Sequence, residues 1–95
     1  MRENKLKTLW ENGGAAMNCW LSMDSSLAAE AMAYCDWDSI TVDMQHSLID
    51  WRSALTMLQA ASQKDAPTLM RVPWLDPAWI MRALDAGAYG VICPM

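Results

Sequence analysis

The chain has 95 residues, of which 54% are apolar, and it carries a net charge of −4. This length suits one small domain, the apolar fraction is typical of a globular protein, and the acidic balance argues against nucleic acid as a partner. No apolar run approaches the roughly 20 residues that span a bilayer, and the charged segment 1–12 lacks the apolar core of a signal peptide, so we expect a cytoplasmic protein with no membrane partner.

The first part of the chain predicts a helix, a strand and a second helix. Residues 2–12 form a short amphipathic pattern, and the Gly13-Gly14 pair is typical of a helix end. Residues 15–22 are mostly apolar, as in a buried strand. Good helix formers occupy 27–35, directly after serines that favour the opening of a helix.

The rest of the chain continues this alternation. Asp50 and Asp76 are predicted N-caps, Pro77 suits a first helical position, and Gly87 is a predicted stop. The predicted elements are a strand at 38–43, a helix at 50–61, a strand at 66–72, a helix at 76–86 and a strand at 89–93.

An N-terminal helix followed by β-α-β-α-β-α-β predicts an α/β fold whose parallel strands are joined by right-handed crossovers. The strands are apolar on both faces, so we expect helices to cover both sides of the sheet. No helix follows the last strand, which leaves an open apolar edge. We therefore expect either a fragment of a larger α/β fold or a sheet that partner chains complete.

The three cysteines, Cys19, Cys35 and Cys93, are far apart and odd in number. This spacing predicts neither a disulfide framework nor a zinc site. Because free cysteine behaves as a small apolar residue, we expect all three to be reduced and buried.

Four residues near the ends of the predicted strands are candidates for a site: Trp20, Asp43, His46 and Arg71. Taken singly, they can be a core ring, a turn former, a loop residue and one half of a surface ion pair. Ligands of parallel α/β folds bind at the C-terminal ends of the strands, so their convergence favours a site. Arg71 follows an apolar strand and needs an anionic partner, which is either Asp43 or a substrate carboxylate held by two hydrogen bonds.

Five short motifs carry a resemblance to a known family: W-L at 20–21, D-x-x-H at 43–46, R-V-P at 71–73, L-D-A-G-A at 84–88 and P-M at 94–95. Over almost its whole length the chain resembles the N-terminal part of the HpcH/HpaI aldolase/citrate lyase family. The resemblance implies the first half, about four strands, of a TIM-barrel-like fold, with residues 1–95 forming one incomplete domain.

The resemblance also implies roles for individual residues. The catalytic residues would be His46 as acid/base, Arg71 as the cation that steadies the keto-acid oxygens, and Asp43 and Asp85 as supporting acids; substrate would be bound by Trp20, Gln45 and Arg71. Gln45 stands where the family often has glutamate, and Ser47 stands where glycine commonly follows the histidine. A missing carboxylate next to the imidazole would change its pKa.

The activity that the resemblance implies is that of a class II aldolase, which cleaves a 2-keto-3-deoxy or 4-hydroxy-2-oxo acid to pyruvate and an aldehyde. A divalent metal, Mg²⁺, Mn²⁺ or Co²⁺, would stabilise the enolate. Its ligands are expected on later strands and none within this chain, so we expect the chain alone to be inactive. We also expect a homo-oligomer. The alternative is a non-catalytic half-barrel that self-associates or binds a small carboxylate.

Overall fold

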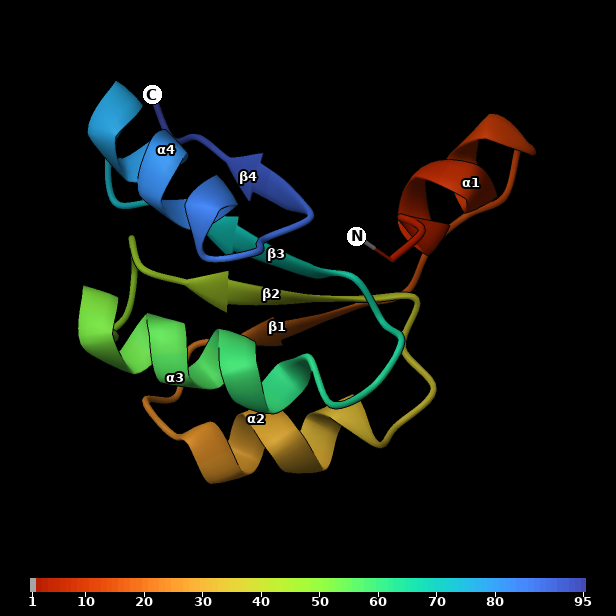
Figure 1. Cartoon of the computed structure of the whole chain (residues 1–95), viewed down its shortest axis with the longest axis horizontal. Coiled ribbons are helices and arrows are strands. Elements are labelled where there is room, and N and C mark those ends of the chain that lie inside the picture. The colour runs from red at the N-terminus through yellow and green to blue at the C-terminus, as the bar shows by residue number, and fades with distance from the viewer. Residues whose placement is uncertain (1) are drawn as a thin grey trace.

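The computed structural model describes residues 2–95, in which four helices alternate with four strands (Figure 1). The elements are α1 (Lys5–Glu11), β1 (Asn18–Leu21), α2 (Ser26–Ala33), β2 (Ser39–Asp43), α3 (Trp51–Ala61), β3 (Thr68–Arg71), α4 (Pro77–Asp85) and β4 (Gly90–Ile92). This confirms the predicted order of elements, although most of them are shorter than predicted. Several residues expected in the strands belong instead to the loops that enter and leave them.

Side-chain caps determine where the three longer helices begin. Asp50 Oδ1 accepts a hydrogen bond from the Ser53 amide at 2.9 Å, and Asp76 caps α4 in the same way, with Pro77 in its first turn. Both predicted caps are confirmed. Gly87 has φ +97° just after α4, a backbone conformation that residues with a side chain rarely adopt, so it is the stop that the sequence predicted.

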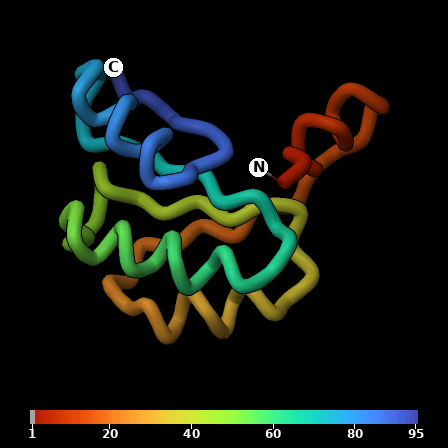
Figure 2. Tube along the Cα trace, in the orientation of Figure 1, coloured from red at the N-terminus to blue at the C-terminus, as the bar shows by residue number. Residues whose placement is uncertain are grey.

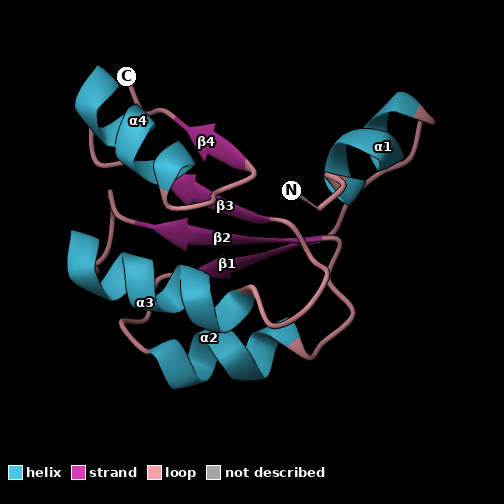
Figure 3. Ribbon diagram, in the orientation of Figure 1, coloured by secondary structure: helices cyan, strands magenta, loops and turns pink. Residues whose placement is uncertain are grey.

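The strands form one parallel sheet in the order β1-β2-β3-β4. Each strand therefore pairs with the one that precedes it in the chain, and each crossover passes through a helix (Figure 3). In the register, Trp20 lies opposite Thr41, while Asp43 lies opposite Arg71. This register brings the end of β2 beside the end of β3.

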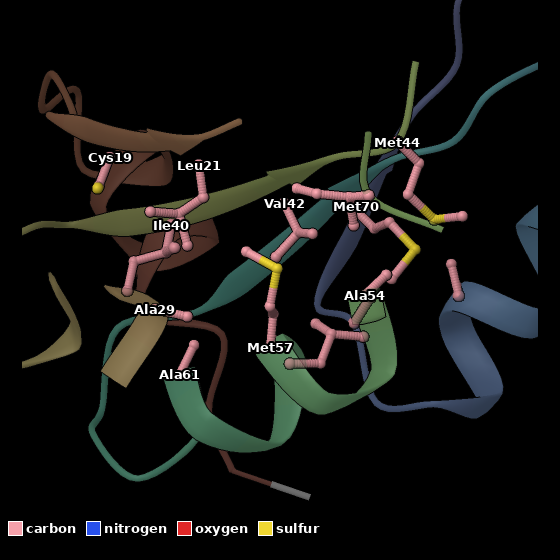
Figure 4. Packing of buried hydrophobic residues seen from close by; sticks show 14 of the residues in the cluster. Cys19, Leu21, Ala29, Ile40, Val42, Met44, Ala54, Met57, Ala61 and Met70 are labelled. Carbon is pink, nitrogen blue, oxygen red and sulfur yellow. The ribbon is translucent and has the colours of Figure 1, made fainter. Parts of the chain in front are cut away.

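The apolar core lies between the sheet and helices α2, α3 and α4 (Figure 4). Alternate strand residues contribute to it, because successive side chains of a strand point to opposite faces. The main contributors are Cys19 and Leu21 of β1, Ile40 and Val42 of β2, Met70 of β3, Ala29 of α2, Ala54, Met57 and Ala61 of α3, and Ala83 of α4. Small alanines on the helices let them approach the sheet closely.

The expectation that helices cover both faces of the sheet is wrong for the described residues. The face opposite the core carries polar and aromatic side chains, among them Trp20, Thr41, Asp43 and Arg71. Only β2 is buried along its whole length, whereas β1 alternates between exposed and buried residues. The apolar runs in the sequence hid this alternation, because tryptophan and leucine can occupy either face.

The expectation for the cysteines is only partly correct. Cys19, Cys35 and Cys93 are all free, but only Cys19 is buried. Cys19 faces the core from β1, whereas Cys35 and Cys93 lie in loop segments after α2 and β4. Burial raises the pKa of the Cys19 thiol, which keeps this side chain neutral.

Helix α1, which is the red part of the tube in Figure 2, lies at the end of the sheet where the strands begin (Figure 1). Lys5 forms an ion pair with Asp65 at 3.1 Å, and Asn4 Nδ2 donates a hydrogen bond to the Tyr89 carbonyl at 3.2 Å. These contacts attach the first helix to the segments that lead into β3 and β4. None of the helices within residues 2–95 combines the length and apolar character needed to cross a bilayer.

Candidate active site

The centre of the candidate site is an ion pair between the last residues of β2 and β3. Arg71 Nε donates to Asp43 Oδ1 at 2.9 Å, and Arg71 Nη2 donates to Asp43 Oδ2 at 2.6 Å. The Asp43 side chain is 2% exposed and the Arg71 side chain 21% exposed. The sequence left two partners open for Arg71, Asp43 or a substrate carboxylate. In the structure the edge of the guanidinium that carries Nε and Nη2 pairs with Asp43.

Three further donors surround the Asp43 carboxylate. Oδ1 accepts from the amides of Gln45 and His46 at 2.9 and 3.2 Å, and Oδ2 accepts from Trp20 Nε1 at 3.2 Å. The hydrogen bond from Arg71, followed by those from Gln45, Trp20 and His46, holds the pKa of Asp43 far below its usual range, although burial opposes this. Asp43 is therefore ionised near neutral pH, where it serves as an anchor and not as a proton acceptor.

Trp20 joins the ion pair from β1. Besides its hydrogen bond to Asp43, its ring lies under the Arg71 guanidinium, with 4.8 Å between Cζ and the ring centroid. The Trp20 side chain remains 45% exposed. Three neighbouring strands thus contribute Trp20, Asp43 and Arg71 to one group, as the sequence predicted.

His46 lies in the loop after β2, and its position depends on Asp43. The two amides that Asp43 accepts come from residues two and three positions later, which is the geometry of an Asx turn. The His46 side chain is exposed and that of Gln45 half-buried, and neither makes a side-chain hydrogen bond within residues 2–95. Asp43 therefore contacts His46 through the backbone and leaves the imidazole free.

Ser47 has a role in this loop that the sequence reasoning missed. Its hydroxyl donates to the Asp43 carbonyl and accepts from the Ile49 amide at 3.0 Å. The second contact is a Ser/Thr turn, in which a hydroxyl bonds to the backbone two residues further on. A serine two residues before an apolar residue, just after a strand, was the available signal. The loop that carries His46 is thus tied by Asp43 and by Ser47.

Asp85 is not part of this group. It is the last residue of α4. In the loop that follows, the Tyr89 amide donates a hydrogen bond to the carbonyl of Thr68, which is the first residue of β3. A helix that follows a parallel strand runs back towards the start of the sheet, so its last residue lies at the opposite end from Arg71. Within one chain, Asp85 therefore does not join the group around Asp43, and its role as a supporting acid stays a prediction.

The described residues do not offer a metal site. No group of three or more His, Cys, Asp or Glu side chains lies close enough together within residues 2–95 to hold an ion. Asp43 would be the natural ligand near His46, but its two oxygens already accept five hydrogen bonds.

Chemically, the arrangement combines a fixed cation with a free imidazole at the C-terminal end of the sheet. Arg71 has five N–H donors, of which two are committed to Asp43. The remaining three, including both on Nη1, can hold anionic or carbonyl oxygens. The imidazole of His46 is exposed at the same end of the sheet.

Comparisons with known proteins identify relatives of this chain. The family model for HpcH/HpaI aldolase/citrate lyase matches residues 16–95. The chain is 45% identical over 92 residues to a hydroxypyruvate/pyruvate aldolase of Rhizorhabdus wittichii, covering 97% of this chain and 37% of that protein. It is 31% identical over 93 residues to a 4-hydroxy-2-oxo-heptane-1,7-dioate aldolase of Escherichia coli, covering 98% of this chain and 36% of that one.

The fold is similar to solved structures as well. A crystal structure of an HpcH/HpaI aldolase/citrate lyase family protein from Burkholderia cenocepacia superimposes with a TM-score of 0.89 at 34% identity, and the match covers 98% of this chain and 37% of that one. The chain thus spans little more than a third of its relatives and has the α/β arrangement of one half of a barrel. On the family model and on these relatives, the chain belongs to the HpcH/HpaI aldolase/citrate lyase family.

Proposed function

We propose that this chain is the N-terminal part of a class II aldolase that cleaves a 2-keto-3-deoxy or 4-hydroxy-2-oxo acid to pyruvate and an aldehyde. The observation that carries the proposal is the Asp43–Arg71 ion pair beside the loop of His46, at the C-terminal ends of β2 and β3. The names of the Rhizorhabdus and Escherichia relatives support an aldolase activity on a small oxo acid.

In the proposed reaction His46 is the general base. It removes the proton from the hydroxyl of the substrate, the neighbouring carbon–carbon bond breaks, and an aldehyde leaves. The electron pair of the broken bond passes to the remaining three-carbon unit as an enolate, and a proton returned by the imidazolium converts it to pyruvate. Arg71 uses its uncommitted N–H groups to hold the oxo-acid oxygens and the charge that develops on them.

We also propose that the complete enzyme depends on a divalent metal and is a homo-oligomer. The described residues offer no ligand set for the metal, so the steps assigned here are those of this chain's own side chains. Gln45 is proposed to contact substrate from the half-buried turn beside His46.

The test uses residues 1–95 joined to the remaining part of the Rhizorhabdus aldolase. We expect His46→Ala to lower kcat for aldol cleavage about 10²–10⁴-fold, which is the usual contribution of a general base. Arg71→Lys should have a similar effect, because lysine lacks the planar fork that pairs with Asp43 and presents further donors. Asp36→Asn, at an exposed position that makes no side-chain hydrogen bond in the described part of the chain, is the control. Unchanged cleavage by His46→Ala would contradict the proposal.

A non-catalytic half-barrel is the second candidate. It is favoured by the number of large apolar side chains on the surface, including Trp74, Leu75, Met81 and Leu84 around α4, all about half exposed or more. Such a patch is typical of an interaction surface. If the joined protein folds but cleaves no oxo acid, while the 95-residue chain forms a defined oligomer, this second function is supported.

A further inference from the structure

Trp20 contacts both members of the ion pair, and it does so with different parts of its side chain. The indole Nε1–H donates to Asp43 Oδ2 at 3.2 Å, and the ring face lies 4.8 Å from Arg71 Cζ. Because Trp20 lies opposite Thr41 in the register, its side chain leans along the sheet to reach Asp43, two residues further on in β2. This lean is what brings the ring under the guanidinium.

We infer that Trp20 is a positioning residue, which sets the plane of the Arg71 guanidinium and holds one oxygen of Asp43. This role differs from that of a pocket wall, because Trp20 would act through Arg71 and Asp43 instead of through contact with substrate. The effect of Trp20 on catalysis rests on the proposed aldolase function. The restraint that Trp20 places on Arg71 and Asp43 does not depend on that function.

The inference has a physical basis, because the hydrogen bonds of Arg71 to Asp43 use only Nε and Nη2 of the guanidinium. These two hydrogen bonds hold only the edge of the guanidinium that carries the two atoms. The Trp20 ring against the cation, together with the indole N–H on the same carboxylate, adds a second restraint on the plane of the guanidinium. Cation–π contact favours a guanidinium above the ring, and a hydrogen bond to a charged group is stronger than a neutral one. The three free N–H groups of Arg71 then have a fixed orientation.

Phenylalanine separates the two contributions of Trp20. Trp20→Phe keeps a ring near Arg71 but removes the N–H, whereas Trp20→Leu removes both. If Trp20 only filled space, Phe would serve as well as Trp. The matched control is Trp74→Phe, because Trp74 is 63% exposed and lies in the loop before α4, outside the group around Asp43.

The first experiment measures exchange of indole N–H hydrogens in the 95-residue chain labelled with ¹⁵N-tryptophan. We expect the Trp20 Nε1–H to exchange about tenfold or more slowly than that of Trp74, because its hydrogen bond to the charged carboxylate of Asp43 must break before the hydrogen can exchange. The signal that disappears in Trp20→Phe identifies the residue. Equal exchange of Trp20 and Trp74 would overturn the inference.

The second experiment follows acid unfolding of the same chain by circular dichroism, which is valid for a monomer or an oligomer. Losing the indole donor brings the pKa of folded Asp43 closer to its unfolded value, so the stabilisation by the ionised carboxylate is lost at a higher pH. We expect the unfolding midpoint of Trp20→Phe to move to higher pH and that of Trp74→Phe to stay. A midpoint for Trp20→Phe equal to that of the control would also overturn the inference.

The third experiment uses the joined aldolase and separates kcat from KM. Misplacing Arg71 should lower kcat of Trp20→Phe about tenfold or more, with a smaller change in KM, because a small error of position at the reacting group is costly. A change in KM alone would make Trp20 a pocket wall and overturn the positioning role. If the unmodified joined protein is inactive, the proposed function fails, while the exchange and unfolding results still decide how Trp20 holds the ion pair.

Discussion

At the scale of single residues, Asp43 stands out among the described residues because its carboxylate accepts five hydrogen bonds. A nearly fully buried carboxylate is costly unless it is paired and hydrogen-bonded, and Asp43 meets both conditions through Arg71, Trp20 and two backbone amides. The same carboxylate therefore neutralises Arg71 and fixes the start of the loop that carries His46. In the proposed mechanism its function is structural and electrostatic, and proton transfer is assigned to the imidazole of His46.

Replacing Asp43 by asparagine tests this assignment. The amide keeps the size of the side chain but leaves the Arg71 cation without a counter-charge and turns one acceptor into a donor. We expect Asp43→Asn to lower the free energy of unfolding by about 3 kcal/mol, the lower end of the range for breaking a buried pair, as measured by urea denaturation. The exposed Asp36→Asn should change it by less than about 0.5 kcal/mol. Equal stabilities of the two variants would show that the pair contributes nothing.

The pH dependence of stability follows from the same carboxylate. The pKa of Asp43 is lowered in the folded state by its hydrogen bonds, Arg71 first. Its contribution is therefore complete above the unfolded pKa of about 3.9 and is lost as the pH falls below that value. Asp50 and Asp65 also have lowered pKa values, through bonds from Ser53 and Lys5. We expect stability to fall below about pH 4, and Asp43→Asn to reduce the slope without abolishing it. An unchanged slope in this variant would be evidence against the assignment.

At the scale of elements, the loop between β2 and α3 determines where His46 lies. Asp43 closes its first turn, and Ser47 connects the end of β2 to Ile49, whose side chain belongs to the core. A loop tied at both ends can present an exposed side chain without moving freely. Asp50 then begins α3 directly after this loop.

The contribution of Ser47 can be measured separately. Removing its hydroxyl in Ser47→Ala leaves the Ile49 amide and the Asp43 carbonyl without their partner, which should cost about 1 kcal/mol. We expect the Ile49 amide to exchange with solvent faster in this variant, as measured by hydrogen exchange. Leu48→Ala, at a position that is 92% exposed, is the control and should leave the exchange of Ile49 unchanged. If Ser47→Ala behaves like this control, the hydroxyl does not hold the loop.

At the scale of the whole molecule, one layer of helices covers one face of a four-stranded sheet whose outer strands β1 and β4 each have one neighbour within residues 2–95. Unpaired strand edges and large exposed apolar side chains are both liabilities for an isolated chain. Together with these edges, the exposed side chains of Trp74, Leu75, Met81 and Leu84 around α4 increase the surface through which the chain can associate.

We therefore expect the 95-residue chain to form oligomers or to aggregate at tens of micromolar, roughly the range in which exposed apolar surface drives association. Sedimentation velocity measures this directly. A double variant, Met81→Lys with Leu84→Lys, should reduce association if the surface of α4 takes part, and Asp36→Asn should not. A stable monomer of the unchanged chain at these concentrations would contradict the expectation.

Much of the fold follows from local features of the sequence. The caps Asp50 and Asp76, the stop at Gly87 and the β-branched run of β2 each act within a few residues, so the alternation of helices and strands was predictable. The presence of a group at the strand ends was predictable too, because parallel strands bring their C-terminal ends together. The family resemblance also followed from motifs that can be seen in the sequence alone, and the family model confirms it.

Only the tertiary structure decided which side chains meet. Whether Arg71 pairs with Asp43 or awaits a substrate depends on the register of β2 against β3, which no local pattern determines. The lean of Trp20 onto that pair and the distance of Asp85 from it depend on the direction of strands and helices in space. Local chemistry determines where elements begin and end, whereas contacts between elements depend on packing over long sequence separations.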